Sequence, residues 1–278
     1  EIRLSLVGSE MCIRDSRNLC RKRYGYFMMQ DRYKERNFRI DSNERIAAKT
    51  YRMVLEGDTS DFTAPGQFAN VAVEGKFLRR PISVCDYSEG SLTLLYDVVG
   101  DGTRQMSEMK PGTTLNLLTG LGNGFSTVAE SRRPVLVGGG IGVAPLLNLA
   151  KALRRAGKEP EIILGFNTSA DVVLEKEFKD MRFGTVVTTA DGSYGLKGFV
   201  TDAPGLKEGT YDYFYACGPM PMLRALCGIP VITGELSLDE RMACGFGVCM
   251  CCSLETRDGA KRICKDGPVF KKEELIWK

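Results

Sequence analysis

The stretch Cys244-Gly-Phe-Gly-Val-Cys249-Met-Cys251-Cys252 places four cysteines within one short loop, and Cys264 follows further along the chain. A C-x4-C-x2-C run with one distant cysteine is a spacing that holds a [2Fe–2S] cluster. Cys244, Cys249 and Cys252 satisfy this spacing, and Cys264 is the candidate fourth ligand. The stretch therefore predicts an iron–sulfur module at the C-terminal end of the chain.

Zinc is the alternative occupant of these cysteines, because four thiolates also suit a tetrahedral zinc ion. Zinc sites usually pair one C-x2-C with another, and the sequence holds no second such pair. Gly245 and Gly247 allow the tight loop that a cluster needs, including backbone with positive φ. Cys251 makes a different ligand conceivable, although the spacing favours Cys252. If the cluster exchanges electrons over a short distance with another protein, an edge of the loop around 245–250 should lie near the surface.

Composition excludes several classes of protein. The chain has 278 residues, 43% of them hydrophobic and 26% charged, with a net charge of +3, so neither nucleic acid nor an anionic membrane is indicated as a partner. It contains no histidine, which removes Ser-His-Asp hydrolysis, His-ligated zinc and His-ligated haem. No apolar stretch of transmembrane length appears. Ten cysteines, several of them in motifs, favour a reducing cytoplasm over a disulfide framework.

The N-terminal segment does not follow the pattern of the rest. The chain begins at Glu1, and residues 1–16 show no amphipathic period, cap or turn. Residues 17–36 are basic and aromatic, which would also suit a nucleic-acid arm. We expect residues 1–30 to be a non-native or disordered extension, with the native chain starting near Met28 or Met29.

The pattern of predicted secondary structure changes once in the middle of the chain. Short segments rich in β-formers, separated by Pro-Gly and Glu-Gly turns, predict a small antiparallel barrel, with strands at 46–55, 67–73, 81–85, 91–98 and 113–117. From Pro134 onward strands and helices alternate, which predicts a doubly wound parallel sheet. Its expected strands are 134–137, 161–166, 185–189 and 213–216, and its expected helices are 145–156, 171–181 and 220–226.

A glycine-rich turn joins the first of these strands to its helix. Gly138, Gly139, Gly140 and Gly142 stand where backbone amides and a helix N-terminus can meet a pyrophosphate. By itself such a run also fits simple tight packing. A second loop, Cys217-Gly218-Pro219, lies at another strand end and helix start.

Two motifs in the barrel resemble a known flavin site. Arg80-Pro81-Ile82-Ser83 followed by Gly100-Asp-Gly102-Thr103 is similar to the flavin-binding motifs of the ferredoxin-reductase superfamily, whose members join a flavin barrel to a nucleotide-binding α/β domain. The alternative interpretation is that Arg79 and Arg80 are a solvated pair before a turn-forming proline.

The resemblance assigns roles to these residues. It implies that Arg80 binds the FAD pyrophosphate, that Pro81, Ile82 and Ser83 face the flavin ring, and that Gly102 and Thr103 contact phosphate. The segment Leu95, Tyr96 and Asp97 is expected to lie along the flavin. In the superfamily the loops at 138–142 and 217–219 flank the nicotinamide. Asn167 stands where members that select NADP tend to have a basic residue, so it favours NAD over NADP.

The flanks of the cysteine loop narrow the family. The segments 236–249 and 264–270 closely resemble the C-terminal module of the electron-transfer subunits of class 1B dihydroorotate dehydrogenases, and the likeness extends over about 39–277. It implies a relay in which the nicotinamide exchanges a hydride with FAD and the cluster carries single electrons. It also implies a hetero-oligomer with an FMN-containing catalytic subunit that oxidises dihydroorotate to orotate.

Two other functions stay open. The small subunit of an NADH-dependent ferredoxin:NADP+ oxidoreductase or of a sulfide dehydrogenase looks similar, although those relatives tend to carry aspartate where Cys244 stands. The other is a zinc-binding regulatory module.

The predicted fold is multi-domain, α+β and α/β. It comprises an FAD-binding antiparallel β-barrel at 31–130, an NAD-binding α/β domain at 131–230 and a [2Fe–2S] module at 231–278.

Overall fold

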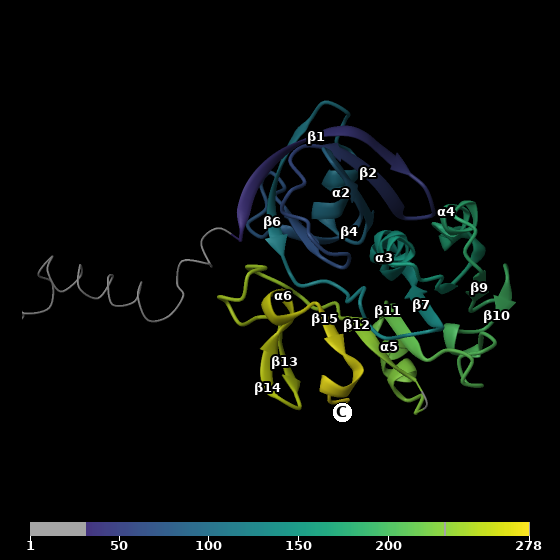
Figure 1. Ribbon diagram of the computed structural model, residues 1–278. Helices are drawn as coiled ribbons and strands as arrows, with labels where there is room; N and C mark the ends of the chain where they lie inside the picture. The colour runs from purple at the N-terminus through teal and green to yellow at the C-terminus, as the bar shows by residue number, and fades with distance from the viewer. Residues whose placement is uncertain (1–31, 231, 278) are drawn as a thin grey trace, which may run out of the picture.

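The computed structural model describes residues 32–230 and 232–277, so the extension expected at 1–30 lies outside the described residues. Figure 1 shows a barrel above a twisted sheet, with the C-terminal module beside the sheet and below the barrel. None of the helices in the described ranges has the length and apolar character needed to cross a membrane.

The N-terminal unit is a closed antiparallel barrel with the strand order β1-β2-β5-β4-β3-β6. Its core is apolar and includes Phe38, Met53 and Leu94, all fully buried. The strands are β1 (Lys34–Arg45), β2 (Thr50–Glu56), β3 (Phe68–Val71), β4 (Arg80–Ser88), β5 (Ser91–Asp97) and β6 (Thr114–Leu121), and helix α2 (Asp101–Ser107) lies between β5 and β6. The predicted antiparallel barrel is confirmed.

Strand β1 was missed by the sequence-based prediction, which began the barrel near Arg45. Its twelve residues, KERNFRIDSNER, are mostly charged or polar, and only Phe38 and Ile40 are buried. The strand nevertheless closes the barrel, because it pairs with β2 on one side and with β6 on the other. Two inward apolar residues were too weak a periodic signal against so many charges.

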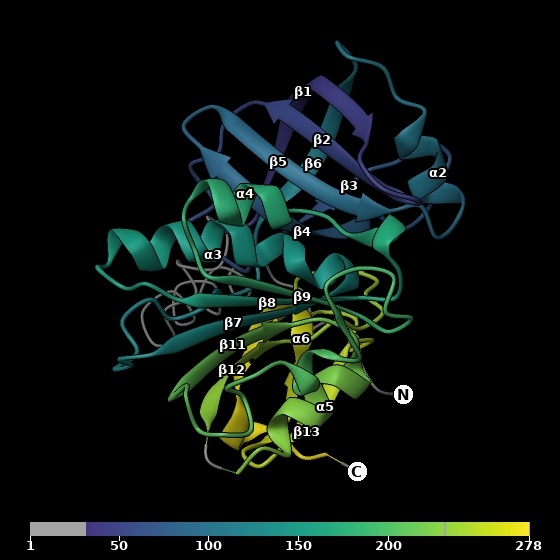
Figure 2. The same ribbon diagram turned by 90° about the vertical axis from the view of Figure 1, so that its right-hand side faces the viewer.

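The second unit is a seven-stranded sheet with the order β10-β9-β8-β7-β11-β12-β15, parallel except for its last strand. Helices α3 and α4 lie between the sheet and the barrel, whereas α5 covers the opposite face (Figure 2). The elements are β7 (Pro134–Gly139), α3 (Ala144–Arg155), β8 (Glu161–Phe166), α4 (Glu175–Asp180), β9 (Thr185–Thr189), β10 (Leu196–Lys197), β11 (Tyr213–Cys217), α5 (Met220–Cys227) and β12 (Thr233–Ser237), with 3-10 turns η3 (Gly140–Val143), η4 (Ser169–Asp171) and η5 (Val200–Asp202).

The predicted helix at 171–181 is wrong at its start. Asp171 ends the short turn η4, where its carboxylate accepts from the N–H and hydroxyl of Thr168. Leu174 then adopts a positive φ of 63°, and α4 begins only at Glu175. A residue with positive φ interrupts the right-handed helix.

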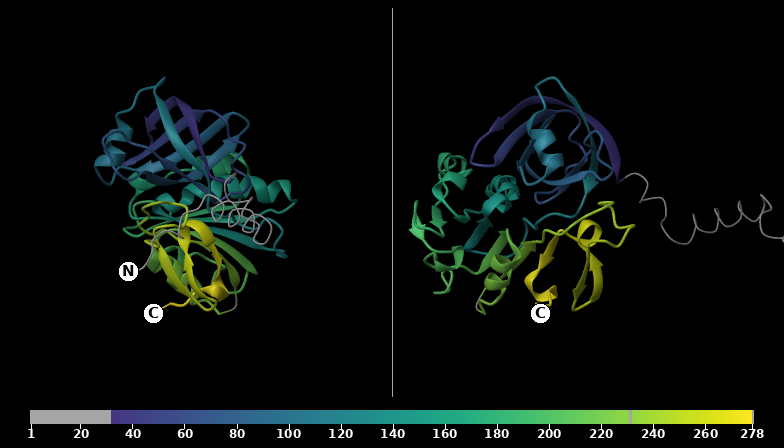
Figure 3. Two further views of the ribbon diagram at one scale, coloured as in Figure 1. Left: turned by 90° about the vertical axis from the view of Figure 1, so that its left-hand side faces the viewer. Right: turned by 180° about the vertical axis from the view of Figure 1, so that it is seen from behind.

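The C-terminal residues are divided between the sheet and the cysteine loop. Strand β12 continues the sheet beside β11, and β15 (Val269–Lys271) returns antiparallel to β12, followed by the 3-10 turn η6 (Lys272–Glu274). Between them lie the cysteine loop, the hairpin β13 (Ser253–Thr256) and β14 (Gly259–Arg262), and helix α6 (Ile263–Asp266). Figure 3 shows this module beside the sheet in two further views.

The barrel docks on the sheet through strand β4 and helix α3. Asp86 of β4 accepts a hydrogen bond from Asn148 Nδ2 at 2.9 Å and pairs with Lys151, both on α3. A second ion pair joins Arg52 of β2 to Glu177 of α4. Buried Leu95 of the barrel packs into the same apolar cluster as the α3 side chains. These contacts fix the barrel on one face of the sheet.

Asn123, between β6 and β7, holds the chain that follows the last cysteine. Its Nδ2 donates to the carbonyls of Asp266 and Val269 at 3.0 and 3.1 Å, and its Oδ1 accepts from Val269 N–H at 3.0 Å. The backbone N–H of Asn123 also donates to the Gly267 carbonyl at 2.7 Å. One side chain thus fastens the return strand of the C-terminal module to the barrel–sheet linker.

We predict that Asn123→Ala lowers the free energy of unfolding by about 1–3 kcal/mol, because three side-chain hydrogen bonds are lost and their buried partners stay unpaired. Hydrogen exchange should speed up at the amides of β15 and much less in β2 and β5. Asn37→Ala, which alters an exposed asparagine of β1, should change stability by no more than about 0.5 kcal/mol. Equal effects of the two substitutions would contradict this role of Asn123.

Candidate functional site

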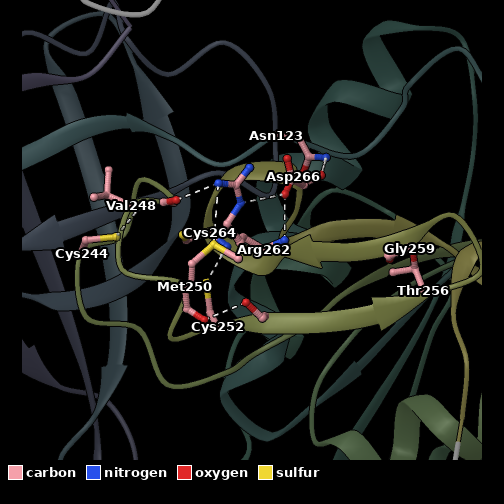
Figure 4. Close-up of polar contacts among 12 residues, drawn as sticks. Asn123, Cys244, Val248, Met250, Cys252, Thr256, Gly259, Arg262, Cys264 and Asp266 are labelled. Atoms are coloured by element: carbon pink, nitrogen blue, oxygen red, sulfur yellow. Dashed lines mark hydrogen bonds and ion pairs between the residues drawn. The ribbon is translucent and has the colours of Figure 1, made fainter.

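The predicted cluster cysteines come from one loop and from helix α6. Cys244, Cys249 and Cys252 lie on the loop after β12, and Cys264 lies in α6, where it follows strand β14 (Figure 4). Cys252 and Cys264 are buried, Cys244 is half-buried and Cys249 is exposed. All the cysteines in the described residues are free thiols.

The four predicted ligands lie close enough to influence one another. The Cys249 thiol interacts with that of Cys244, and the Cys264 thiol is affected by both Cys252 and Cys244. Backbone amides also reach the sulfurs: Val248 N–H donates to Cys244 Sγ at 3.3 Å, and Cys264 N–H donates to Cys252 Sγ at 3.4 Å. Such N–H donors stabilise thiolates and the sulfur atoms of clusters.

The pKa values of two of these thiols move in opposite directions. Burial disfavours the Cys244 thiolate, but hydrogen bonds from the Cys249 thiol and from nearby backbone N–H groups outweigh it and lower its pKa to about 6. Burial and then the neighbouring Cys252 thiol raise the pKa of Cys264 to about 12. A bound cation would therefore favour the thiolate form of Cys264 at neutral pH.

The donor set of the loop fits a [2Fe–2S] cluster, whose two irons are held by four thiolates. The backbone N–H groups that donate to the sulfurs of Cys244 and Cys252 also suit such a cluster. Four thiolates would likewise suit one zinc ion, and metal analysis distinguishes the two occupants.

One edge of the cysteine loop is exposed, as expected from the sequence. Val248 is 73% exposed and Met250 is 54% exposed. The inner side is held by Arg262, whose Nη1 donates to the Gly247 carbonyl at 2.9 Å and whose guanidinium pairs with Asp266 (Figure 4). The loop therefore presents an apolar edge outward while its base is fixed.

A cleft of about 480 Å³ lies between the barrel and the sheet. The barrel contributes Lys49, Thr50 and Asp97, and the sheet contributes the ends of its strands and the loops that follow them, among them Gly139, Gly140, Asn167, Asp171, Pro219 and Met222. Of the predicted site residues, Asp97, Gly139, Gly140 and Pro219 thus line one cleft, formed at the carboxyl ends of parallel strands, where nucleotides bind in such sheets.

Asp97 is fixed by two neighbours that sequence reasoning missed. Thr50 Oγ1 donates to its Oδ1 at 2.6 Å, and Lys49 Nζ lies 2.9 Å from its Oδ2. Both come from the turn into β2, where a single lysine and a single threonine form no motif. Strand pairing brings them to Asp97, because Thr50 and Asp97 are register partners.

Arg80 and Gly102 are brought together although they are far apart in the sequence. A Cβ atom built on Gly102 would lie 2.1 Å from Arg80 Nε, so the guanidinium rests directly on the glycine. Thr103 follows in the first turn of α2, and its hydroxyl accepts from the N–H groups of Val99 and Gly100 and donates to the Gly100 carbonyl. That hydroxyl is already engaged in capping the helix.

The remaining predicted flavin residues differ in accessibility. Pro81, Ile82 and Ser83 are half-buried on β4, next to Arg80. Leu95 and Tyr96 are each only 2% exposed, and the Tyr96 hydroxyl donates to Asn43 inside the barrel. Leu95 and Tyr96 could therefore contact a ligand only through their backbone, and their flavin contacts stay a prediction.

The two nucleotide loops touch each other through glycines. A Cβ on Gly142 would lie 2.5 Å from the Cys217 carbonyl oxygen and 2.6 Å from Gly218 Cα. On the strand itself, a Cβ on Gly138 would meet Val143 at 2.7 Å, and one on Gly139 would meet Met222 at 2.6 Å. The glycine run therefore serves tight packing, and this packing brings the two loops together.

Cys217 is a buried thiol and not a reactive one. Burial raises its pKa to about 12, although a hydrogen bond with Ser237 opposes the shift. Cys85 is likewise buried, and burial raises its pKa. These cysteines belong to the packing of the sheet and barrel, in contrast to the four of the cluster loop.

Comparison with protein families separates the same two parts of the chain. Residues 136–228 match the oxidoreductase NAD-binding domain family. Residues 239–276 match the iron–sulfur cluster binding domain of dihydroorotate dehydrogenase B. The second match contains all four predicted ligands.

Similar proteins cover nearly the whole chain. An electron transfer subunit of dihydroorotate dehydrogenase B (NAD+) from Geobacillus sp. is 43% identical over 256 residues, covering 87% of this chain and 99% of the relative. The subunit of the same name from Fusobacterium nucleatum is 41% identical over 246 residues, covering 83% and 94%. Among solved structures, a chain of an NADH-dependent reduced ferredoxin–NADP oxidoreductase is 31% identical with a TM-score of 0.77, covering 86% of this chain and 90% of that one.

We predict that replacing any one of the four ligands by serine, as in Cys244→Ser, Cys249→Ser, Cys252→Ser or Cys264→Ser, disrupts the cluster. Cys251→Ser should leave it assembled, because Cys251 is exposed and its thiol donates to the Arg241 carbonyl at 3.6 Å. Iron, acid-labile sulfide and the visible spectrum of the purified variants provide the measurement. Loss of the cluster in the Cys251 variant alone would overturn the ligand assignment.

Proposed function

Because the chain belongs to the family of electron-transfer subunits of dihydroorotate dehydrogenase B, we propose that it carries electrons between a catalytic subunit and NAD+. The catalytic subunit would contain FMN and oxidise dihydroorotate to orotate for pyrimidine synthesis. The observation that carries the proposal is the four-thiol loop, which is attached to an NAD-binding sheet and lies against a flavin-type barrel.

The chain's own residues would bind and orient the cofactors. Bound FAD and the [2Fe–2S] cluster would supply the redox chemistry, with two electrons exchanged as a hydride on the nicotinamide side and single electrons on the cluster side. Arg80, lying on Gly102, would hold the FAD pyrophosphate, and Ser83 would offer a hydroxyl to the flavin ring. Cys244, Cys249, Cys252 and Cys264 would hold the irons.

The cleft favours NAD over NADP. Asn167 and Asp171 line it where the adenosine end of a dinucleotide would follow strand β8. A carboxylate at this place would repel a 2′-phosphate, and asparagine adds no compensating charge. The loops with Gly142 and Cys217–Pro219 would flank the nicotinamide.

The exposed edge of the cysteine loop would face the catalytic subunit. Val248 and Met250 supply an apolar surface beside the half-buried and exposed cysteines. A cluster that passes electrons to another subunit needs a short path to it, so we propose a hetero-oligomer joined at this edge. Since thiolate ligands need a reducing compartment, we place the complex in the cytoplasm.

A second candidate is the corresponding subunit of an NADH-dependent ferredoxin:NADP+ oxidoreductase, which the 31% identical solved structure favours. The relatives of higher identity carry the dehydrogenase name. Cys244 also separates the two, because the oxidoreductase-type relatives tend to have aspartate there. A zinc-binding module is distinguished by metal analysis, in which iron with acid-labile sulfide excludes zinc.

We predict that Arg80→Ala weakens FAD binding by about 10- to 100-fold, the loss expected for one charge-assisted hydrogen bond to phosphate. Flavin fluorescence during titration of the FAD-depleted protein measures the affinity. Arg104→Ala removes an exposed arginine of α2 and should change the affinity less than twofold. Equal losses in both variants would show that net charge, and not the Arg80 site, holds the flavin.

The function itself is tested by co-expression with an FMN-containing dihydroorotate dehydrogenase subunit. The two chains should copurify and reduce NAD+ when dihydroorotate is supplied. The complex made with Cys264→Ser should oxidise dihydroorotate with an artificial acceptor yet fail to reduce NAD+. Copurification with no NAD+ reduction by a fully loaded complex would refute the proposed function.

A further inference from the structure

Asn70 is a buried polar residue at the junction of the barrel and the cysteine loop. It lies on β3, a strand of four buried residues, and is only 1% exposed. In the barrel it is the register partner of Pro81 on β4, within the predicted flavin motif, and of Leu118 on β6. No sequence motif marks it, because a single asparagine in a short apolar strand gives no pattern.

The Asn70 amide is in direct contact with the cysteine loop. Its Nδ2 donates to the carbonyl oxygen of Cys244 at 3.3 Å. Gly245 has φ +80°, and a Cβ built on it would lie 2.2 Å from the same nitrogen. The amide therefore lies directly against the backbone of the loop, which only glycine permits at this position.

The other end of the amide is left without a partner. Asn70 Oδ1 is buried, and no group in the described chain donates to it. Turning the amide over would place this oxygen against the Cys244 carbonyl oxygen, so the donor must face the loop. Leaving a buried acceptor unpaired is unfavourable. A side chain kept at that cost points to a role beyond the packing of the barrel.

The backbone of Asn70 is held as well. Arg79 donates to the carbonyl oxygens of Asn70 and Asn116 at 3.4 and 3.3 Å, and its Nη2 donates to Asn116 Oδ1 at 2.7 Å. Arg79 directly precedes the flavin motif on β4. Asn70 thus joins two fixed elements: the strand that begins the flavin site and the first ligand of the cluster.

We propose that Asn70 is a positioning residue for electron transfer between the flavin and the iron–sulfur cluster, because its amide holds the Cys244–Gly245 backbone against the flavin-binding barrel. This inference rests on the function proposed above. It assigns Asn70 no contact with a substrate and no proton to move. Its effect is to fix the separation and orientation of the two cofactor sites, on which the rate of electron transfer depends.

The test uses the full chain loaded with FAD and cluster, in wild-type form and as Asn70→Leu and Asn70→Asp. Both variants remove the N–H donor, and Asp keeps the shape of the side chain. After rapid mixing with NADH, flavin absorbance reports hydride transfer, and EPR of freeze-quenched samples reports reduction of the cluster. We expect flavin reduction within twofold of wild type, cluster reduction slowed at least about tenfold, and altered EPR g-values of the reduced cluster.

Thr119→Val is the matched control. Thr119 is fully buried on β6, and its hydroxyl lies within hydrogen-bond distance of the Lys34 carbonyl and of Asp61, so its loss removes polar contacts of the barrel that do not involve the cysteine loop. This variant should lower the thermal midpoint without slowing cluster reduction or changing the EPR spectrum. A merely structural role of Asn70 would give the same result as this control.

Each outcome decides between the alternatives. Wild-type rates of cluster reduction in both Asn70 variants, or in Asn70→Leu alone, would overturn the proposal, since a donor at this position would then be dispensable. Loss of the cluster from both variants, with FAD content and thermal midpoint retained, would support it, because the amide would then hold the loop itself. If Asn70→Leu misfolds, Asn70→Asp decides. A wild-type protein without FAD, iron and labile sulfide would instead refute the proposed function.

Discussion

The arrangement of the whole chain depends on the placement of one cysteine loop against the barrel. The loop is held at its ends by the sheet, through β12 and β15, and on its face by the barrel, through Asn70 and the Tyr33–Phe246 ring contact at 5.9 Å. Buried Cys252 and Cys264 pack into an apolar cluster that also contains Phe68 of the barrel and Phe214 of the sheet. A shift of either unit would therefore move the thiols relative to both.

Strand β4 carries both the predicted flavin motif and the contact between the barrel and helix α3. Its first residues, from Arg80 to Ser83, carry the flavin motif, and its later residue Asp86 binds Asn148 and Lys151 on helix α3. Because a strand is stiff and its register is fixed by pairing, the motif and the docking contact cannot move independently. The cleft with Asp97 and Gly140 lies between the same two units, so its shape follows from this contact.

Residues in regular patterns could be predicted from the sequence, and residues that act through tertiary contacts could not. Cysteine spacing and the glycine run led to the predicted cluster ligands and nucleotide loops, and the strand–helix alternation led to most strands of the sheet. Strand β1 was not predicted, because charged residues occupy its exposed positions. Helix α4 begins later than predicted, because Leu174 takes a positive φ. Lys49, Asn70 and Asn123 each act through partners distant in sequence, and a single polar residue carries no signal of that kind.

The antiparallel pairing of β12 with β15 has a further consequence. Ser237 and Val269 are register partners, so everything between them leaves the sheet and returns to the same place. For such an excursion the entropy of closure grows slowly, by roughly 0.6 kcal/mol for each doubling of length. The strands that bind the nucleotide are therefore nearly indifferent to the size of the segment that carries the thiols. A change in the length of the hairpin between Ser253 and Arg262 would therefore cost the pairing of β12 with β15 little.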